Sequence, residues 1–155
     1  MKQPKYRQGL VIRTIKNGTV IDHINGGEAL NVLRIIGITG STDEIVSVAT
    51  HVKSTLMGKK DVVKIENREL SHEEVDRIAL IAPKASINIV RDHDVVEKIG
   101  VTVPDTIVGI VRCPNPGCIS NAGEPIQTKF VMESRGLVCS YCDWVLASDI
   151  TSHFL

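Results

Sequence analysis

The four cysteines of this chain constrain its fold more than any other feature. They follow the pattern Cys113-x4-Cys118-x20-Cys139-x2-Cys142, in which a longer segment separates two close pairs. This pattern is typical of tetrahedral coordination by thiolates, because each pair forms one knuckle and the intervening hairpin brings the knuckles together. Gly117 and the Pro-Asn-Pro run before it favour a tight turn around a metal. We therefore expect these cysteines to bind one zinc ion per chain.

Four protein sulfurs leave no position on zinc for a water or a substrate. The expected zinc is therefore structural and not catalytic. It would replace the apolar core that a region of about 50 residues cannot build, so folding of this region should depend on the metal. Other readings of the same residues remain open: cadmium or iron could bind the four sulfurs, and free thiols or two disulfides would also account for them.

The charge of the chain argues against some classes of partner. Eighteen basic residues balance eighteen acidic ones, so no whole-chain field attracts nucleic acid or anionic lipid. Residues 1–9 are polar and basic without the apolar run of a signal peptide, and no stretch approaches membrane-spanning length. We expect a cytoplasmic protein, in which paired cysteines are metal ligands more often than disulfides.

Strand patterns dominate the first hundred residues. Asn17-Gly18 lies between two β-rich runs and favours a tight hairpin turn. Within residues 60–66, Asp61, Val63 and Ile65 share one face, and the two lysines lie on the other. Strands are predicted at residues 10–15, 20–24, 45–52, 60–66 and 86–90.

Two helices are predicted between these strands. The first spans residues 28–36, with Leu30, Leu33 and Ile36 on one face. The second begins at a capping box formed by Ser71 and Glu74 and stops before Pro83. Its apolar stripe consists of Val75, Ile78, Ala79 and Ala82. The order strand, helix, strand, strand, helix, strand predicts an α+β, ferredoxin-like antiparallel sheet with two helices on one face.

Residues 101–105 (VTVPD) are interpreted as the joint between two domains, 1–102 and 103–155. From Ile107 onward the chain has short strand patterns around the cysteines, which predicts a small all-β, zinc-ribbon-like domain. We expect few contacts to cross the short joint, so that each domain keeps its own fold.

Three motifs resemble the aspartate carbamoyltransferase regulatory chain family. They are residues 19–24 (TVIDHI), 58–67 (GKKDVVKIEN) and 113–120 (CPNPGCIS), in this order and followed by the terminal Cys-x2-Cys. The resemblance extends from about Leu10 to Cys142 and includes the domain order.

The resemblance implies a non-catalytic, allosteric regulatory subunit in pyrimidine biosynthesis. In this family the N-terminal domain binds nucleoside triphosphates: CTP inhibits, ATP activates, and UTP acts alongside CTP in some members. The zinc domain docks the chain onto the catalytic chain, and regulatory chains pair as homodimers in an assembly of six regulatory and six catalytic chains.

The resemblance also implies an effector site. Asp22 and His23 match a motif at the sugar and phosphates, Lys98 matches a phosphate-contacting lysine, and Lys60 and Lys64 match lysines on the ribose and base side. His93 departs from the family, in which tyrosine is common at this position. The residues that line the base pocket and its approaches are Ile12, Ile15, Val20, Asn88, His93 and Val95.

Two other functions compete with this one. A nucleic-acid-binding module is the main alternative, because zinc ribbons and ferredoxin-like sheets both serve that role, but the neutral charge and lack of aromatics argue against it. An enzyme using Asp22 and His23 lacks a nucleophile and an open metal position. Without the resemblance, the lysines would be ordinary solvated residues, and the sequence contains no Walker or Gly-x-Gly-x-x-Gly motif.

Overall fold

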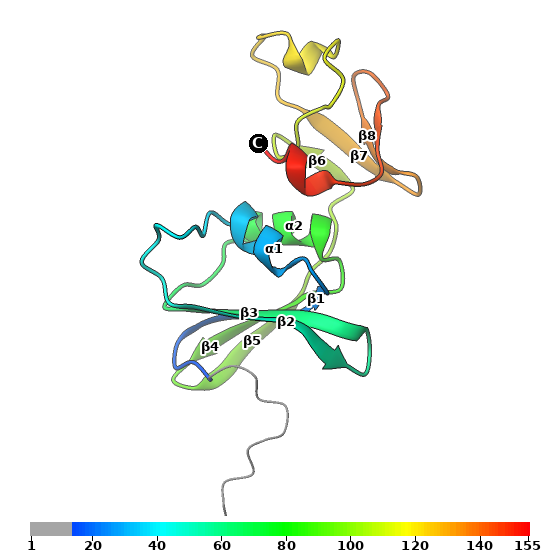
Figure 1. The fold of residues 1–155 in the computed structure, drawn as a ribbon. Helices are drawn as coiled ribbons and strands as arrows, with labels where there is room; N and C mark the ends of the chain where they lie inside the picture. Colours follow the sequence, from blue (N-terminus) through cyan, green and yellow to red (C-terminus); the bar gives the residue numbers. More distant parts are fainter. Residues whose placement is uncertain (1–13) are drawn as a thin grey trace, which may run out of the picture.

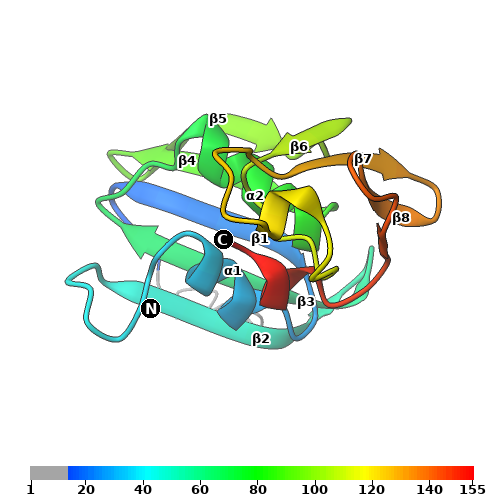
Figure 2. The same ribbon diagram turned by 90° about the horizontal axis from the view of Figure 1, so that it is seen from above.

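The computed structural model describes residues 14–155, which form two units stacked on one another (Figure 1). The N-terminal unit contains an antiparallel sheet with the strand order β2-β3-β1-β4-β5. Helices α1 (Ala29–Ile35) and α2 (His72–Ile81) cover the same face of this sheet (Figures 1 and 2). The strands are β1 (Gly18–Asn25), β2 (Val46–Ser54), β3 (Gly58–Glu66), β4 (Ser86–Arg91) and β5 (Asp94–Gly100). The predicted ferredoxin-like arrangement is confirmed, with β5 added at one edge.

The start of the chain differs from the prediction. Most of the strand predicted at 10–15 lies outside the described residues, and its described end, Thr14 and Ile15, is not in a strand. The hairpin predicted at Asn17-Gly18 is therefore not seen in the described part. Asn17 instead accepts a backbone hydrogen bond from Asn67, and its side chain accepts one from Asp92.

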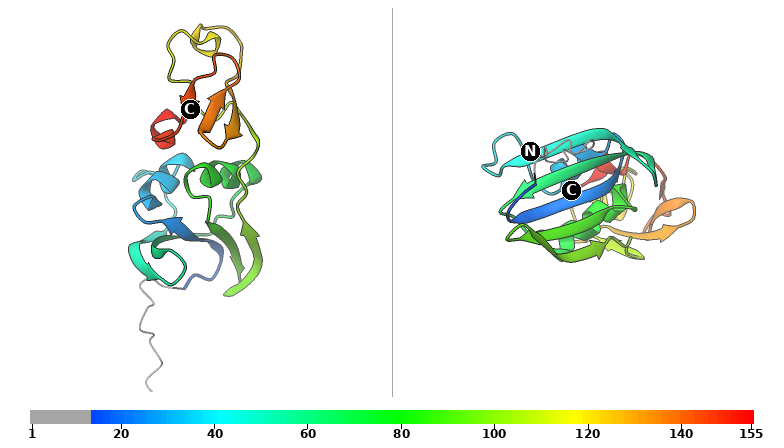
Figure 3. Two further views of the ribbon diagram at one scale, coloured as in Figure 1. Left: turned by 90° about the vertical axis from the view of Figure 1, so that its right-hand side faces the viewer. Right: turned by 90° about the horizontal axis from the view of Figure 1, so that it is seen from below.

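Side-chain alternation gives the sheet one buried and one open face. On β3, Asp61, Val63 and Ile65 are fully buried beneath the helices, whereas Lys60 and Lys64 lie on the opposite face and are partly exposed. Ile21 of β1 and Ile87 of β4 extend the same apolar core. The opposite face is not covered by any described helix or strand and points away from the C-terminal unit (Figure 3).

The helices begin where the sequence indicates. Ser71 accepts from the backbone of Glu74 and Glu74 accepts from the backbone of Ser71, so the predicted capping box is confirmed. The predicted stripe of α2 is buried, but Leu30 of α1 is 70% exposed, which corrects its placement on one face with the buried Leu33 and Ile36. The short helix buries Ala29, Val32, Leu33 and Ile35 instead, and this turns Leu30 towards solvent.

The C-terminal unit is built from short strands around the cysteines, as predicted. Its four-stranded antiparallel sheet consists of β6 (Thr106–Val108), β7 (Lys129–Glu133), β8 (Gly136–Cys139) and β9 (Val145–Leu146). Two short 3₁₀ helices, η1 (Ile119–Asn121) and η2 (Ile150–His153), complete the unit. Phe130 and Leu137 form its small apolar core together with the cysteines.

A small set of apolar contacts crosses between the units at the helix layer. Leu80 of α2 is buried in the core of the C-terminal unit, and Phe154 packs against the cores of both units. Val111 and Phe154 form an isolated antiparallel bridge, which holds the end of the chain at this boundary. The C-terminal unit therefore rests on the helix layer, on the side away from the open face of the sheet (Figures 1 and 3).

Candidate functional site

The four cysteine sulfurs converge on one point in the C-terminal unit. All four lie within 4.8 Å of one another. The Sγ atoms of Cys113 and Cys142 are 3.6 Å apart, and those of Cys118 and Cys139 are 3.7 Å apart. A tetrahedron with zinc–sulfur bonds of about 2.3 Å has edges of about 3.8 Å, whereas a disulfide requires about 2.05 Å. The sulfurs therefore fit a metal ion such as zinc, as predicted, and none is in a disulfide.

Local hydrogen bonds hold the first knuckle in shape. The backbone of Asn115 accepts from the amide of Cys118, and its side chain accepts from the amide of Gly117. Asn121 donates to the carbonyl oxygens of Cys113 and Asn115 at 2.9 and 2.7 Å. These contacts close a tight loop between the first two cysteines, as the Pro-Asn-Pro-Gly run indicates.

Burial at this site disfavours thiolate charge that no cation compensates. Burial raises the pKa of the Cys113 and Cys139 thiols above the ordinary value. Burial also raises the pKa of Cys142, but hydrogen bonds from Asn115, from the Trp144 backbone and from neighbouring thiols together lower it to about 7. Buried thiolates need a cation close by, and a metal held by four of them has no open position. The site can stabilise the fold but offers no Lewis-acid position.

A second set of predicted residues forms a row across the open face of the N-terminal sheet. Val20 of β1 pairs with Lys64 of β3 on one side and with Asn88 of β4 on the other. Asn88 in turn pairs with Lys98 of β5. Residues paired across antiparallel strands project from the same face, so the four side chains follow one another over about 14 Å. We call Lys64, Val20, Asn88 and Lys98 the effector row.

Asp22 and His23 lie beside this row on the same face. Strand alternation alone would point these neighbours to opposite faces. The register of β1 shifts between Ile21 and Ile24, however, and His23 adopts a positive φ of 57°. As a result, His23 Nδ1 lies 3.2 Å from Ser86 Oγ, and Ser86 is the strand partner of Asp22. The bulge thus brings together two side chains that a regular strand would separate.

Charged partners tune the groups around Asp22. Lys60 Nζ lies 2.9 Å from a carboxylate oxygen of Asp22. Burial raises the pKa of Asp22, but the hydrogen bond from Lys60, a backbone hydrogen bond from His23 and both nearby charges hold it below the ordinary value. Burial lowers the pKa of Lys64, and the charge of Asp22 offsets this only in part. Lys60 is thus tied to Asp22.

A basic pocket of about 250 Å³ adjoins the effector row at Lys98. Its lining residues are His23, Leu56, Met57, Lys84, Ser86 and Lys98. Two lysines, a histidine and a hydroxyl thus face one space, and no carboxylate is among the described residues that line it. Lys84 and Ser86 were not predicted from the sequence. Ser86 could have been found only from the pairing of β1 with β4, which places it opposite Asp22. Lys84 carries no sequence signal, because a lysine two residues before a serine is too common a pattern to indicate a site.

The remaining predicted residues are not gathered in this pocket. Ile12 lies outside the described residues, and Ile15 is buried. His93 is exposed in the turn between β4 and β5, and Val95 pairs with Val90 near that turn. Both lie beyond Lys98 towards the other end of the sheet, so the structure does not bring them next to the basic pocket.

Comparison with known proteins identifies both units. Residues 10–102 match the model of the aspartate carbamoyltransferase regulatory chain, allosteric domain, and residues 105–152 match the model of its metal binding domain. The chain is similar to aspartate carbamoyltransferase regulatory chains of Methanoculleus marisnigri (63% identity over 96% of both chains) and Methanospirillum hungatei (59% over the full length of both). The one from Haloarcula marismortui is 50% identical over 96% of both chains. Within the described part of the chain, no helix is long and apolar enough to span a membrane.

Proposed function

Because the chain belongs to the aspartate carbamoyltransferase regulatory chain family, we propose that its open sheet face binds nucleoside triphosphates, CTP and ATP among them, as allosteric effectors. The observation that carries this proposal is the effector row, which leads into a basic pocket at Lys98. The chain is a regulatory, non-catalytic member of its complex in pyrimidine biosynthesis. Its effect on the catalytic chain requires different affinities for the effector in two states of the assembly.

The charges of the site indicate how a nucleotide would lie. The polyphosphate suits the pocket, where Lys84, Lys98 and His23 supply cationic or donor groups and Ser86 supplies a hydroxyl. The ribose and base then extend along the effector row towards Lys64, over the side chain of Val20. Asp22 can accept from ribose hydroxyls or hold Lys60 in place.

The C-terminal unit, called the metal-binding unit from here on, is proposed to dock the catalytic chain. It presents a hollow of about 1010 Å³ between the first cysteine loop and the end of the chain. Pro114, Pro116 and Ile126 contribute apolar surface there, and Arg112, Glu124 and Asn121 contribute polar groups around it. A surface with this mixture is typical of a protein interface. Since the cysteines shape the first loop, loss of the metal should remove this surface.

The edge strand β2 is proposed to pair two regulatory chains. β2 is nine residues long and lies at the edge of the sheet, where no described strand pairs with its outer side. Beside it, Leu30 and Ile45 are 70% and 62% exposed, and Leu33, Ile38 and Val46 line an adjacent groove. A second copy would cover these apolar side chains. We further propose a cytoplasmic assembly of six regulatory and six catalytic chains.

Calorimetric titration of the purified chain with CTP, ATP and a single-stranded RNA oligomer tests the proposal. Each nucleotide should bind with a stoichiometry of one per chain, and the RNA oligomer should not bind. Recognition of single strands relies on aromatic stacking, and residues 18–100 contain no Phe, Tyr or Trp. Binding of the oligomer without binding of nucleotides would support the nucleic-acid alternative and overturn the proposed function.

A further inference from the structure

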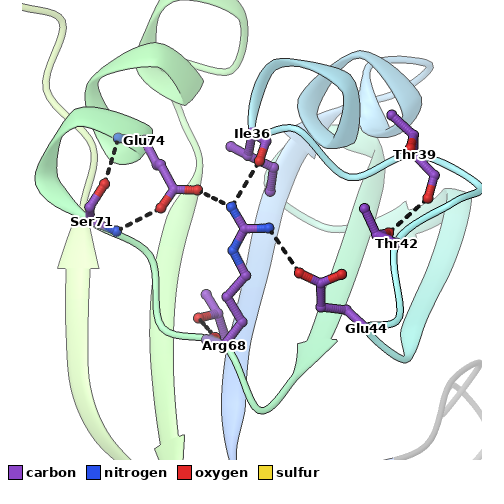
Figure 4. A network of polar contacts seen from close by, with 8 residues as sticks. Ile36, Thr39, Thr42, Glu44, Arg68, Ser71 and Glu74 are labelled. Atoms are coloured by element: carbon purple, nitrogen blue, oxygen red, sulfur yellow. Dashed lines mark hydrogen bonds and ion pairs between the residues drawn. The ribbon is translucent and has the colours of Figure 1, made fainter.

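Arg68 lies in the loop between β3 and α2 and joins four segments of the N-terminal unit (Figure 4). Its guanidinium donates to the backbone oxygen of Ile36 at 2.8 Å, where α1 ends, and forms an ion pair with Glu74 in the first turn of α2. It also reaches Glu44, ahead of β2, at 3.3 Å. The backbone oxygen of Arg68 accepts a hydrogen bond from Thr19 of β1 at 2.6 Å. One residue thus connects both helices to a central strand.

These contacts require an arginine. The planar guanidinium presents five donors in a fixed fork, so it can serve a carbonyl oxygen and two carboxylates together, whereas a lysine ammonium is a point charge on a flexible stem. The Arg68 side chain is 24% exposed, and those of Glu44 and Glu74 are 30% and 22% exposed. Glu74 also accepts from the backbone of Ser71, so α2 keeps its cap without Arg68.

Arg68 links β1, which carries part of the effector row, to the helices on the other face of the sheet. Thr19 is fully buried and directly precedes Val20 of the effector row. The helices lie between the sheet and the metal-binding unit, into whose core α2 inserts Leu80. Apolar contacts between the helices and the sheet have no preferred direction and permit small sliding motions. The hydrogen bonds of Arg68 are directional and oppose such sliding.

We propose that Arg68 is a positioning residue for allosteric coupling, which makes the helix layer move together with β1 when an effector occupies the open face. The inference rests on the proposed function, since it requires a nucleotide on the effector row. The Arg68 side chain contacts the end of α1 and the first turn of α2, which cover the face of the sheet opposite the effector row, and it does not line the basic pocket. Its loss should therefore reduce communication more than nucleotide affinity.

The test compares Arg68→Lys and Arg68→Gln with the control Arg91→Gln in holoenzymes assembled with the catalytic chain. Arg91 forms an ion pair with Glu69, but both side chains are well exposed, and their contact does not involve a helix. Calorimetry measures the dissociation constant of CTP, and aspartate saturation curves measure the CTP-induced shift in half-saturation. We expect both Arg68 variants to keep CTP affinity within about threefold, while the shift falls to less than about half. Arg91→Gln should retain both.

The outcomes separate the inference from the proposed function. A full CTP shift in both Arg68 variants would overturn the inference. The contacts of the Arg68 side chain with Ile36, Glu44 and Glu74, which we call the clamp, would then be a purely structural feature. Parallel losses of CTP affinity and shift would also overturn it, because Arg68 would then act on binding. If Arg68→Gln does not fold, Arg68→Lys and Glu44→Gln still report on the clamp, since each keeps part of it. A wild-type enzyme indifferent to nucleotides would overturn the proposed function itself.

Discussion

The two units of this chain reach stability by different means. Among the residues that the structure describes, the N-terminal unit packs sixteen buried apolar residues between a sheet and two helices. The C-terminal unit has nine residues in its core, and three of these are cysteines, while a fourth is Leu80, supplied by α2. A core of that size contributes little burial free energy, so the metal must supply what apolar packing does not. The contrast indicates that the N-terminal unit should fold without the metal, whereas the fold of the C-terminal unit should depend on it.

The largest expected effect is the loss of the metal centre. Cys139→Ala leaves three thiolates and should abolish stable metal binding, because structural zinc supplies about 10–16 kcal/mol to small zinc domains. The C-terminal unit should unfold while β1 to β5 persist. Metal analysis and amide NMR spectra measure both outcomes. Ser140→Ala, at the exposed neighbouring position, is the matched control and should retain the metal. Full metal occupancy in Cys139→Ala would contradict the four-cysteine assignment.

The reciprocal change targets the apolar core. Ile65→Ala removes a fully buried side chain of β3 and should cost about 2–5 kcal/mol of stability in the N-terminal unit. Val96→Ala on β5 is half-exposed and should cost less than about 1 kcal/mol. Chemical denaturation followed by amide NMR signals of each unit gives the two stabilities. If the two units of the Ile65→Ala variant unfolded at the same denaturant concentration, their stabilities would not be independent, which would contradict the contrast between the two units.

A smaller effect is expected at the phosphate side of the open face. Lys98→Ala should weaken nucleoside triphosphates by roughly ten- to a hundredfold, because a charge-assisted contact contributes about 1.5–3 kcal/mol. Binding of the nucleoside should change much less. Lys129→Ala, an exposed lysine on β7 of the other unit that does not line the pocket, is the control. Calorimetry with CTP and cytidine distinguishes these cases, and equal losses for both ligands would remove Lys98 from the phosphate site.

The smallest effect concerns the ionisation of Asp22. Its folded-state pKa is below the ordinary value, so its contribution to stability is present above about pH 4 and is lost as the pH falls through the folded pKa. Lys60→Met removes the hydrogen bond and charge that lower it, and the pKa of Asp22 should rise. Lys59→Met, on the adjacent exposed position, should leave it unchanged. An NMR titration of the Asp22 carboxyl provides the measurement. An unchanged pKa of Asp22 in Lys60→Met would show that the contact with Lys60 does not influence the ionisation of Asp22.

The sequence predicted those features that depend on local chemistry. The capping box at Ser71, the alternation of β3 and the cysteine knuckles each follow from residue type and spacing within a few positions. β5 was missed because its residues are almost all exposed and carry no apolar alternation. The bulge at His23 was also missed, since it arises from the register of β1 with its neighbours. Lys84 lines the pocket with His23 and Lys98, and Arg68 contacts Thr19, Ile36 and Glu44. The order of residues alone does not disclose such proximity between positions distant in sequence.

The central claim is that the open sheet face senses the nucleotide while the metal-binding unit holds the catalytic chain. The most direct test measures CTP binding and association with catalytic chains for the full-length chain, with the metal present and after its removal. The account predicts that the metal-free chain binds CTP within about threefold of the metal-loaded chain but no longer associates with catalytic chains. The metal-loaded chain should associate and make aspartate saturation sensitive to CTP. Association of the metal-free chain, or loss of its CTP binding, would contradict the account.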